Sequence, residues 1–188
     1  MRTQKSFKEL RSVGLPILNK DRFNFDITNL KIGSFVKINK AYCVVKNIFT
    51  YKDSDSSWFE LELFSILTAE TIFIEYEVDD IIEIFITTDV IKMRDLPVSF
   101  DDIEEISEEE DGEFDYKGET FYYEDDYKAK FYRTPESKKE KVYFYEFEND
   151  ASTKFLTVEE WGNDSDGYEY KAYISKKLDS SSLEVISI

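Results

Sequence analysis

Four short runs of this sequence alternate aromatic or aliphatic residues with polar, mostly acidic ones, and this alternation strongly limits the possible folds. The runs are WFELELF at 58–64, TIFIEYE at 71–77, VYFYEFE at 142–148 and FLTVEEW at 155–161. Successive side chains of a strand point to opposite faces of a sheet, so a period of two predicts strands with one apolar face. Aromatic residues, 16% of the chain, favour such surfaces. The chain is therefore expected to be mainly β.

The runs occur in a similar order in the two halves of the chain, which predicts an internal duplication. In each half a hairpin precedes an acidic-aromatic strand, and a strand with the pattern Ile/Leu-x-Ile/Val-Glu follows. Ile72-x-Ile74-Glu75 in the first half matches Leu156-x-Val158-Glu159 in the second. Sheets of this size must cover their apolar faces. We therefore predict two similar antiparallel β modules of about four to five strands each, of the sandwich or small-barrel type.

Changes in composition predict the boundaries of these modules. The first module is expected at 29–96 and the second at 113–188, together forming one compact unit. Between them, residues 97–112 hold eight acidic residues and no basic one, a pattern typical of a solvated linker or loop. Residues 1–28 form a basic segment, with a short helix predicted over 5–13, and we expect this segment to pack on the acidic remainder of the chain.

Charge and residue usage exclude several classes of function. The net charge is −17, and the chain has no histidine and one cysteine, Cys43. Without histidine, Ser/His/Asp, Cys/His and zinc-hydrolase sites are excluded, and no cofactor or metal is expected. The acidic charge opposes direct nucleic-acid binding by the body of the protein. No run has the length or apolarity of a signal peptide or transmembrane helix, so a cytoplasmic location is expected.

Six residues of the matching strands are candidates for a partner-binding surface, because acidic side chains there lie near large aromatic ones. They are Trp58, Glu60, Glu75, Glu159, Glu160 and Trp161. A second interpretation brings Glu75 and Glu159 together as the paired acids of a glycoside hydrolase. The structural alternative places each glutamate on an exposed strand face or beside a lysine such as Lys171.

The stretch NDSDG at 163–167 has some features of a calcium loop but is predicted to be a hairpin turn. The calcium pattern requires an acidic residue five positions before the glycine and another six positions after it. Those positions hold Gly162 and Tyr173. The pattern therefore fails, and a turn between two strands is the remaining interpretation.

The order of these segments carries a family resemblance. LKIGSFVKI, YCVV, WFELELF and IFIEYE are followed by FDYKGETFYYEDDYKAKF, VYFYEFE, FLTVEEW and YEYKAYISKKLDSSSLEV. Over residues 29–186 this series resembles the bacterial domain of unknown function 4178 family. Tyr173-Ile174-Ser175 departs from the pattern, because it lacks a glycine often found there. The resemblance implies a non-enzymatic protein and a genetic association with membrane-stress and lipid-associated proteins, and it supplies no catalytic residues.

These observations predict a non-catalytic cytoplasmic protein-binding module, an accessory or adaptor of a membrane-stress-linked bacterial system. Its partner would be a protein that is basic or membrane-associated, and its oligomeric state is left open. The alternative is an acidic immunity or inhibitor protein that blocks a basic toxin or nucleic-acid enzyme. An enzyme that uses carboxylates alone is the third interpretation.

Overall fold

The computed structural model describes residues 5, 8–9, 26–79, 81–163, 165 and 167–188 and is mainly β, as the alternation predicts. Most of the helix predicted over 5–13 lies outside the described residues. The elements are η1 (Ile27–Asn29), β1 (Phe35–Ile38), β2 (Ala41–Lys52), β3 (Ser57–Ser65), β4 (Thr71–Val78), β5 (Ile82–Ile91), η2 (Met93–Asp95), α2 (Phe100–Glu109), β6 (Glu113–Tyr116), β7 (Glu119–Tyr132), β8 (Glu140–Asn149), β9 (Phe155–Asn163), β10 (Gly167–Lys177), η3 (Ser180–Ser182) and β11 (Leu183–Ser187).

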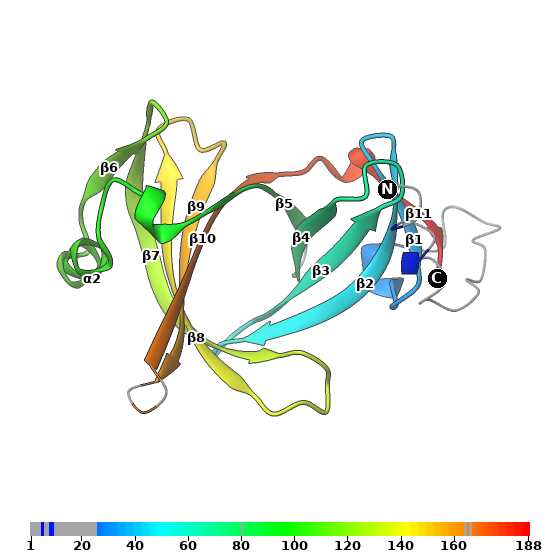
Figure 1. Cartoon of the computed structure of the whole chain (residues 1–188), viewed down its shortest axis with the longest axis horizontal. Helices are drawn as coiled ribbons and strands as arrows, with labels where there is room; N and C mark the ends of the chain where they lie inside the picture. The colour runs from blue at the N-terminus through cyan, green and yellow to red at the C-terminus, as the bar shows by residue number, and fades with distance from the viewer. Residues whose placement is uncertain (1–4, 6–7, 10–25, 80, 164, 166) are drawn as a thin grey trace. The chain divides into compact units, whose positions relative to one another are not determined.

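The strands share one hydrogen-bonded order, β11-β1-β2-β3-β4-β5-β10-β9-β8-β7-β6 (Figure 1). The end of β2 also pairs with β7, and β5 pairs with β10, so strands from the first half of the chain pair with strands from the second half. The prediction of two separate modules is therefore wrong in this respect. The alternation predicted the strands, but their partners depend on long-range pairing that a local pattern does not specify.

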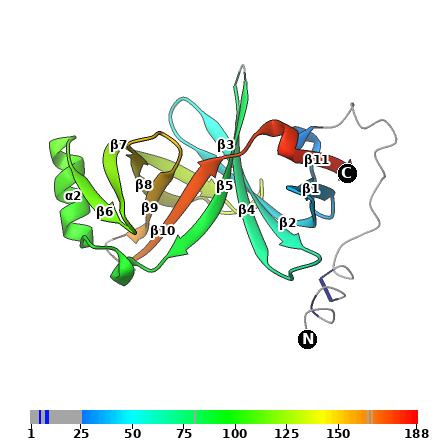
Figure 2. The ribbon, with the colours of Figure 1, turned by 90° about the horizontal axis from the view of Figure 1, so that it is seen from above.

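Two compact units divide the chain at points that differ from the predicted modules. Unit 1 comprises 1–49, 58–84 and 178–188, and unit 2 comprises 50–57 and 85–177. Within unit 1, β11 from the carboxyl end of the chain pairs with β1 (Figure 2). A sequence boundary in the acidic run could not reveal this arrangement, because the C-terminal strand returns to pair with the first one.

Unit 1 contains a tight hairpin and two contacts of the basic N-terminal segment. β1 and β2 are joined at Asn39 and Lys40, whose φ angles of 46° and 74° suit a tight two-residue turn. From the basic segment, the Lys5 ammonium donates to the Ala69 carbonyl oxygen at 3.1 Å. Glu9 of the same segment forms an ion pair with Lys46 at 2.8 Å.

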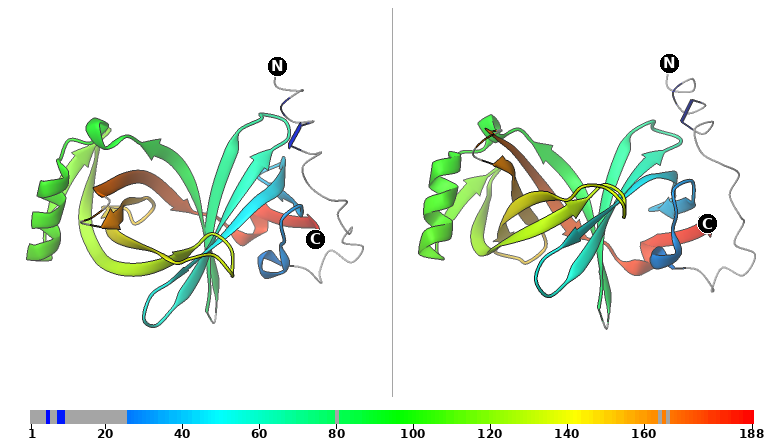
Figure 3. Two further views of the ribbon diagram at one scale, coloured as in Figure 1. Left: turned by 60° about the horizontal axis from the view of Figure 1, so that its bottom comes forward. Right: turned by 90° about the horizontal axis from the view of Figure 1, so that it is seen from below.

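Unit 2 is built on the strand order β5-β10-β9-β8-β7-β6, with the last residues of β2 paired to β7. One sheet face packs against α2, and the shared core includes Ile103, Phe114, Phe147 and Leu156. Figure 3 shows α2 beside β6 and β7 in both views. The helix therefore covers one part of this face.

α2 replaces the predicted acidic linker and lies inside unit 2. Ser99 caps its N-terminus, since the Ser99 hydroxyl accepts from the Asp102 backbone N–H and the Asp102 carboxylate accepts from the Ser99 N–H. Ile103 is fully buried, and Phe100 and Ile106 pack against the same core. Capping and apolar contacts thus outweigh the repulsion among the exposed carboxylates. The linker interpretation gave this repulsion too much weight.

Candidate functional site

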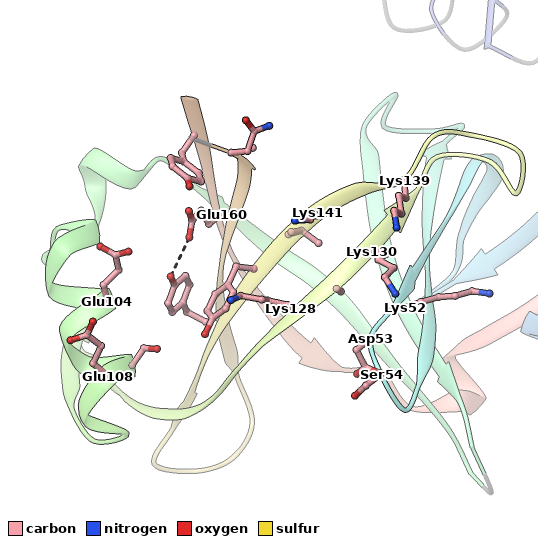
Figure 4. A pocket seen from close by; sticks show the side chains of 18 residues that line it. Lys52, Asp53, Ser54, Glu104, Glu108, Lys128, Lys130, Lys139, Lys141 and Glu160 are labelled. Carbon is pink, nitrogen blue, oxygen red and sulfur yellow. Dashed lines mark hydrogen bonds between the residues drawn. The ribbon is translucent and has the colours of Figure 1, made fainter. Parts of the chain in front are cut away.

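A groove of about 740 Å³ lies in unit 2, on the face of the sheet that α2 partly covers. Its walls come from α2, β7, β8, β9 and β10, with the end of β2, the loop after it and the loop before β8 (Figure 4). This volume falls in the range of pockets that hold small molecules or side chains of a partner. The groove is therefore the candidate functional site.

One side of the groove is an acidic–tyrosine wall, which we define as Glu104, Glu108, Glu160, Tyr143, Tyr145 and Tyr168. Glu104 and Glu108 lie one helical turn apart on α2 and therefore share a face. Glu160 of β9 accepts a hydrogen bond from the Tyr145 hydroxyl at 3.2 Å (Figure 4). Burial, together with the Glu160 charge and hydrogen bond, raises the pKa of Tyr145, so the phenol remains a donor at neutral pH.

Asp126 on β7 fixes the helix and the tyrosines of this wall. Its carboxylate accepts hydrogen bonds from the hydroxyls of Ser107 on α2, at 2.6 Å, of Tyr123, at 3.2 Å, and of Tyr143. Burial alone would raise the pKa of Asp126, but these three hydrogen bonds outweigh it and the net effect lowers the pKa. A charged carboxylate thus ties α2 to the sheet.

The tyrosine hydroxyls bonded to Asp126 stay protonated over the same range. Burial raises the pKa of Tyr143 to about 12, and the Asp126 carboxylate adds to the shift. The pKa of Tyr123 is raised to about 12 in the same way. Both phenols therefore act as fixed hydrogen-bond donors, and the wall needs little reorganisation when a ligand binds.

The other side of the groove is basic. Lys52, Lys130, Lys139 and Lys141 line it, and a fifth lysine of the groove, Lys128, lies with its ammonium 5.1 Å from the centroid of the Tyr143 ring of the wall (Figure 4). All five are exposed. Unit 2 as a whole holds 14 Lys and Arg against 28 Asp and Glu, a net charge of −14. The groove therefore concentrates positive charge in an acidic unit.

Three of the six predicted partner-binding residues lie in unit 1. Trp58 on β3 is buried, with 6% of its surface exposed, and does not present an aromatic surface to a partner. Glu60 on β3 and Glu75 on β4 lie directly opposite each other and are half-buried. The structure therefore brings these two glutamates together.

Glu159, Glu160 and Trp161 lie in unit 2 and are consecutive on β9, so they alternate between the two faces of the sheet. Glu160 belongs to the groove, but Glu159 and Trp161 point to the opposite face. Glu159 is 4% exposed, accepts a hydrogen bond from Trp161 Nε1 at 2.7 Å and lies opposite Lys171 on β10. Burial raises the pKa of Glu159, against the opposing effects of Trp161 and Lys171.

Trp161 packs in an aromatic cluster on this second face. Its ring lies 4.9 Å from Phe131 and 6.5 Å from Tyr51, measured between centroids. The Lys171 ammonium lies 4.3 Å from the centroid of its ring. Of the six predicted residues, only Glu160 lines the groove.

The lysines of the groove are functional candidates that our sequence reasoning missed. The signal available was a Lys-x-Lys pattern at 128–130 and again at 139–141. In a strand, this spacing places both lysines on one face. Lys128 and Lys130 both lie in β7, whereas Lys139 comes just before β8 begins. Lys52, however, comes from a distant segment. Only the register of β2 on β7 places Lys52 beside the others.

The groove can bind charged groups of both signs, whereas the described residues offer no site for a metal ion. No group of three or more Asp, Glu, Cys or His among them is arranged to hold one. Within the part of the chain that the structure describes, no helix has the length and apolarity to span a bilayer. The chemistry that the groove supports is ionic and hydrogen-bonded recognition.

Comparison with protein families identifies the chain. The model for Domain of unknown function (DUF4178) matches residues 31–180, so the chain belongs to that family, as its sequence resemblance predicts. The match extends over most of both halves of the chain and contains every residue that lines the groove. No curated protein and no solved structure matches it.

Proposed function

We propose that this member of the domain of unknown function 4178 family is a non-catalytic protein-binding module that receives basic side chains of a partner protein in the groove of unit 2. The observation that carries the proposal is the acidic–tyrosine wall, where Glu104, Glu108 and Glu160 lie beside tyrosine rings. Carboxylates form ion pairs with lysine and arginine, and aromatic faces attract the same cations.

Two further properties of unit 2 support this function. The hydrogen bonds of Asp126 to Ser107 and Tyr143 hold the wall in place before a partner arrives, which lowers the entropic cost of binding. The net charge of −14 attracts a basic partner at long range. Complementary charge of this kind raises the association rate more than it raises the affinity.

The family resemblance supports a more specific biological setting. It favours a cytoplasmic accessory or adaptor of a membrane-stress-linked system, with a partner that is basic or membrane-associated. Co-expression distinguishes this role from the alternative of an immunity protein. An adaptor co-purifies with such a partner, whereas an immunity protein restores the growth of cells that express a neighbouring toxin.

A pull-down with charge-matched variants tests the proposed site. Glu104→Gln/Glu108→Gln removes two carboxylates of the wall, and Glu105→Gln/Glu109→Gln removes two from the same helix that do not line the groove. Both double variants change the net charge equally. Membrane and soluble fractions of the native cell are kept apart, and the proteins retained by each variant are quantified.

We expect the first variant to lose the partner and the second to retain it. Equal retention by both would refute the groove as the binding site, and equal loss would show that only total charge matters. For the purified pair, rising salt is expected to slow association more than it speeds dissociation. Association that is insensitive to salt would contradict the electrostatic part of the proposal.

A further inference from the structure

Three lysines of the groove form a row across three neighbouring strands. Lys52 of β2 lies directly opposite Lys130 of β7, and Lys130 lies directly opposite Lys141 of β8. We call Lys52, Lys130 and Lys141 the lysine row. Residues directly opposite on antiparallel strands have Cβ atoms about 4.5–5.5 Å apart, and like charges in such positions destabilise a sheet. The row therefore places three lysines side by side on one sheet face, and their side chains extend in different directions (Figure 4).

The protein leaves this repulsion uncompensated. No described side chain forms an ion pair or hydrogen bond with the ammonium groups of the lysine row, although unit 2 has twice as many acidic residues as basic ones. Elsewhere in the same unit, Lys117 pairs with Asp89 and Lys154 pairs with Glu119. Lysines of unit 2 thus do find carboxylates, but those of the row do not.

We propose that the lysine row binds the phosphoryl group of a small phosphorylated molecule. Lysine binds phosphate as a compact positive charge with several donors on a flexible stem. Neighbouring strands are about 4.8 Å apart, so the stems of three adjacent lysines reach a common point above the middle strand. A doubly charged tetrahedral group offers three oxygens to these ammonium groups, whereas a carboxylate offers two oxygens and one charge.

The charge of unit 2 favours a small ligand over an extended anionic surface. Electrostatic interactions at physiological ionic strength are screened beyond about 8 Å. A small anion inside the groove is therefore influenced mainly by the lysines around it. A lipid bilayer or nucleic acid extends over many acidic residues of the unit, whose net charge is −14 and repels it.

The rest of the groove indicates what else the ligand carries. Tyr143 of β8 and Glu160 of β9 lie directly opposite each other, one step along the same sheet face from the lysine row. Glu160 and the α2 residues Glu104 and Glu108 are hydrogen-bond acceptors, and Tyr143 offers an aromatic ring. A phosphorylated compound with amino or hydroxyl groups matches both sides, and the groove volume of about 740 Å³ accommodates one.

This inference goes beyond the proposed partner binding and is tested on the purified protein alone. Pyrophosphate and inorganic phosphate are titrated at low ionic strength, with binding followed by calorimetry and by backbone amide NMR shifts. We expect pyrophosphate to bind more tightly, with shifts centred on β2, β7 and β8. Lys130→Gln should weaken binding about tenfold or more, because it removes the central charged donor.

Lys138→Gln is the matched control, because Lys138 is an exposed lysine of the same region that does not line the groove. Circular dichroism verifies that each variant is folded. Equal weakening by the two substitutions, or no measurable pyrophosphate binding, would overturn the proposal. Failure here leaves the pull-down result with Glu104→Gln/Glu108→Gln unaffected, so the two proposals fail separately.

Two further binding assays determine which kind of molecule carries the anionic group. Flotation with vesicles that contain phosphatidylglycerol tests a lipid headgroup, and an oligoglutamate peptide tests an acidic protein segment. We expect neither to bind as tightly as pyrophosphate. Stronger binding to the vesicles would show that the lysine row binds the headgroup of a membrane lipid instead of a small molecule. Tighter binding of the peptide would show that its ligand is an acidic polypeptide.

Discussion

Replacing Lys130 with glutamine should stabilise the protein in the absence of a ligand. Lys130 lies between Lys52 and Lys141 and therefore takes part in both like-charge pairs of the lysine row. Glutamine keeps most of the length of the side chain but carries no charge. The change therefore removes both repulsions and leaves the backbone pairing intact.

The expected gain follows from Coulomb's law for exposed charges. Two ammonium groups about 7 Å apart in water repel each other by about 0.6 kcal/mol, within the range of roughly 0.2–1 kcal/mol for cross-strand pairs. Removing two pairs should therefore raise the free energy of unfolding by about 1 kcal/mol at low salt. Lys52→Gln or Lys141→Gln removes one pair and should give about half of that. For a chain of this length, 1 kcal/mol corresponds to about 2–4 °C in Tm.

Urea unfolding at low and high salt measures this effect. The gain of Lys130→Gln should disappear near 1 M salt, where the screening length falls to about 3 Å. Saturating pyrophosphate should reverse the order of stability, because it binds the folded wild-type protein more tightly than the variant. Lys138→Gln should give no gain, since it removes a positive charge from an acidic unit. A Lys130→Gln protein that is no more stable than Lys138→Gln at low salt would refute the reasoning.

Four other substitutions, one of them a control, test the packing of α2, a strained glycine position and the buried carboxylate. Ile103→Ala should reduce the free energy of unfolding by about 2–5 kcal/mol, because the side chain is fully buried under α2; a loss below 1 kcal/mol in urea unfolding would mean that the helix does not pack there. Gly162→Ala should disrupt the pairing of β9 with β10, since φ is +115° and a Cβ would collide with the Gly167 carbonyl oxygen. Gly118→Ala, with open space around it, should cost less, and equal thermal shifts would contradict this. Burial raises the pKa of Glu159 above its unfolded value, so the folded state holds the proton more tightly and stability falls as pH rises above about 4.5. Glu159→Gln should flatten that decline in unfolding experiments across pH, and an unchanged slope would show that Glu159 does not titrate in this way.

The strands of this protein could be predicted from its sequence, because their signal is local. WFELELF, TIFIEYE, VYFYEFE and FLTVEEW all lie within strands, and the turns at Asn39-Lys40 and Lys117-Gly118 have the positive φ angles expected of tight hairpins. Alternation and turn chemistry involve residues within a few positions of one another. The family was recognised for a similar reason, since it rests on the order of these segments.

At the helix α2, the sequence holds two conflicting local signals, and the interpretation as a linker followed the wrong one. The capping box of Ser99 and Asp102 and the spacing of Phe100, Ile103 and Ile106 are visible in the sequence. The acidic residues around them suggested a solvated linker instead. Burial of Ile103 against a core drawn from distant strands decides the outcome, and that core does not exist until the sheet has formed.

The sequence by itself determined the β class, the hairpins, the acidic charge and the absence of a histidine-based site. Only the tertiary structure decided which residues face the groove. Glu159 and Glu160 are neighbours in sequence, yet the pleat directs one into the interior and the other into the groove. Lys52 lies far from Lys130 and Lys141 in the chain, and strand register alone places the three side by side. Register arises from long-range pairing, and a shift of one residue would move every side chain of a strand to the other face.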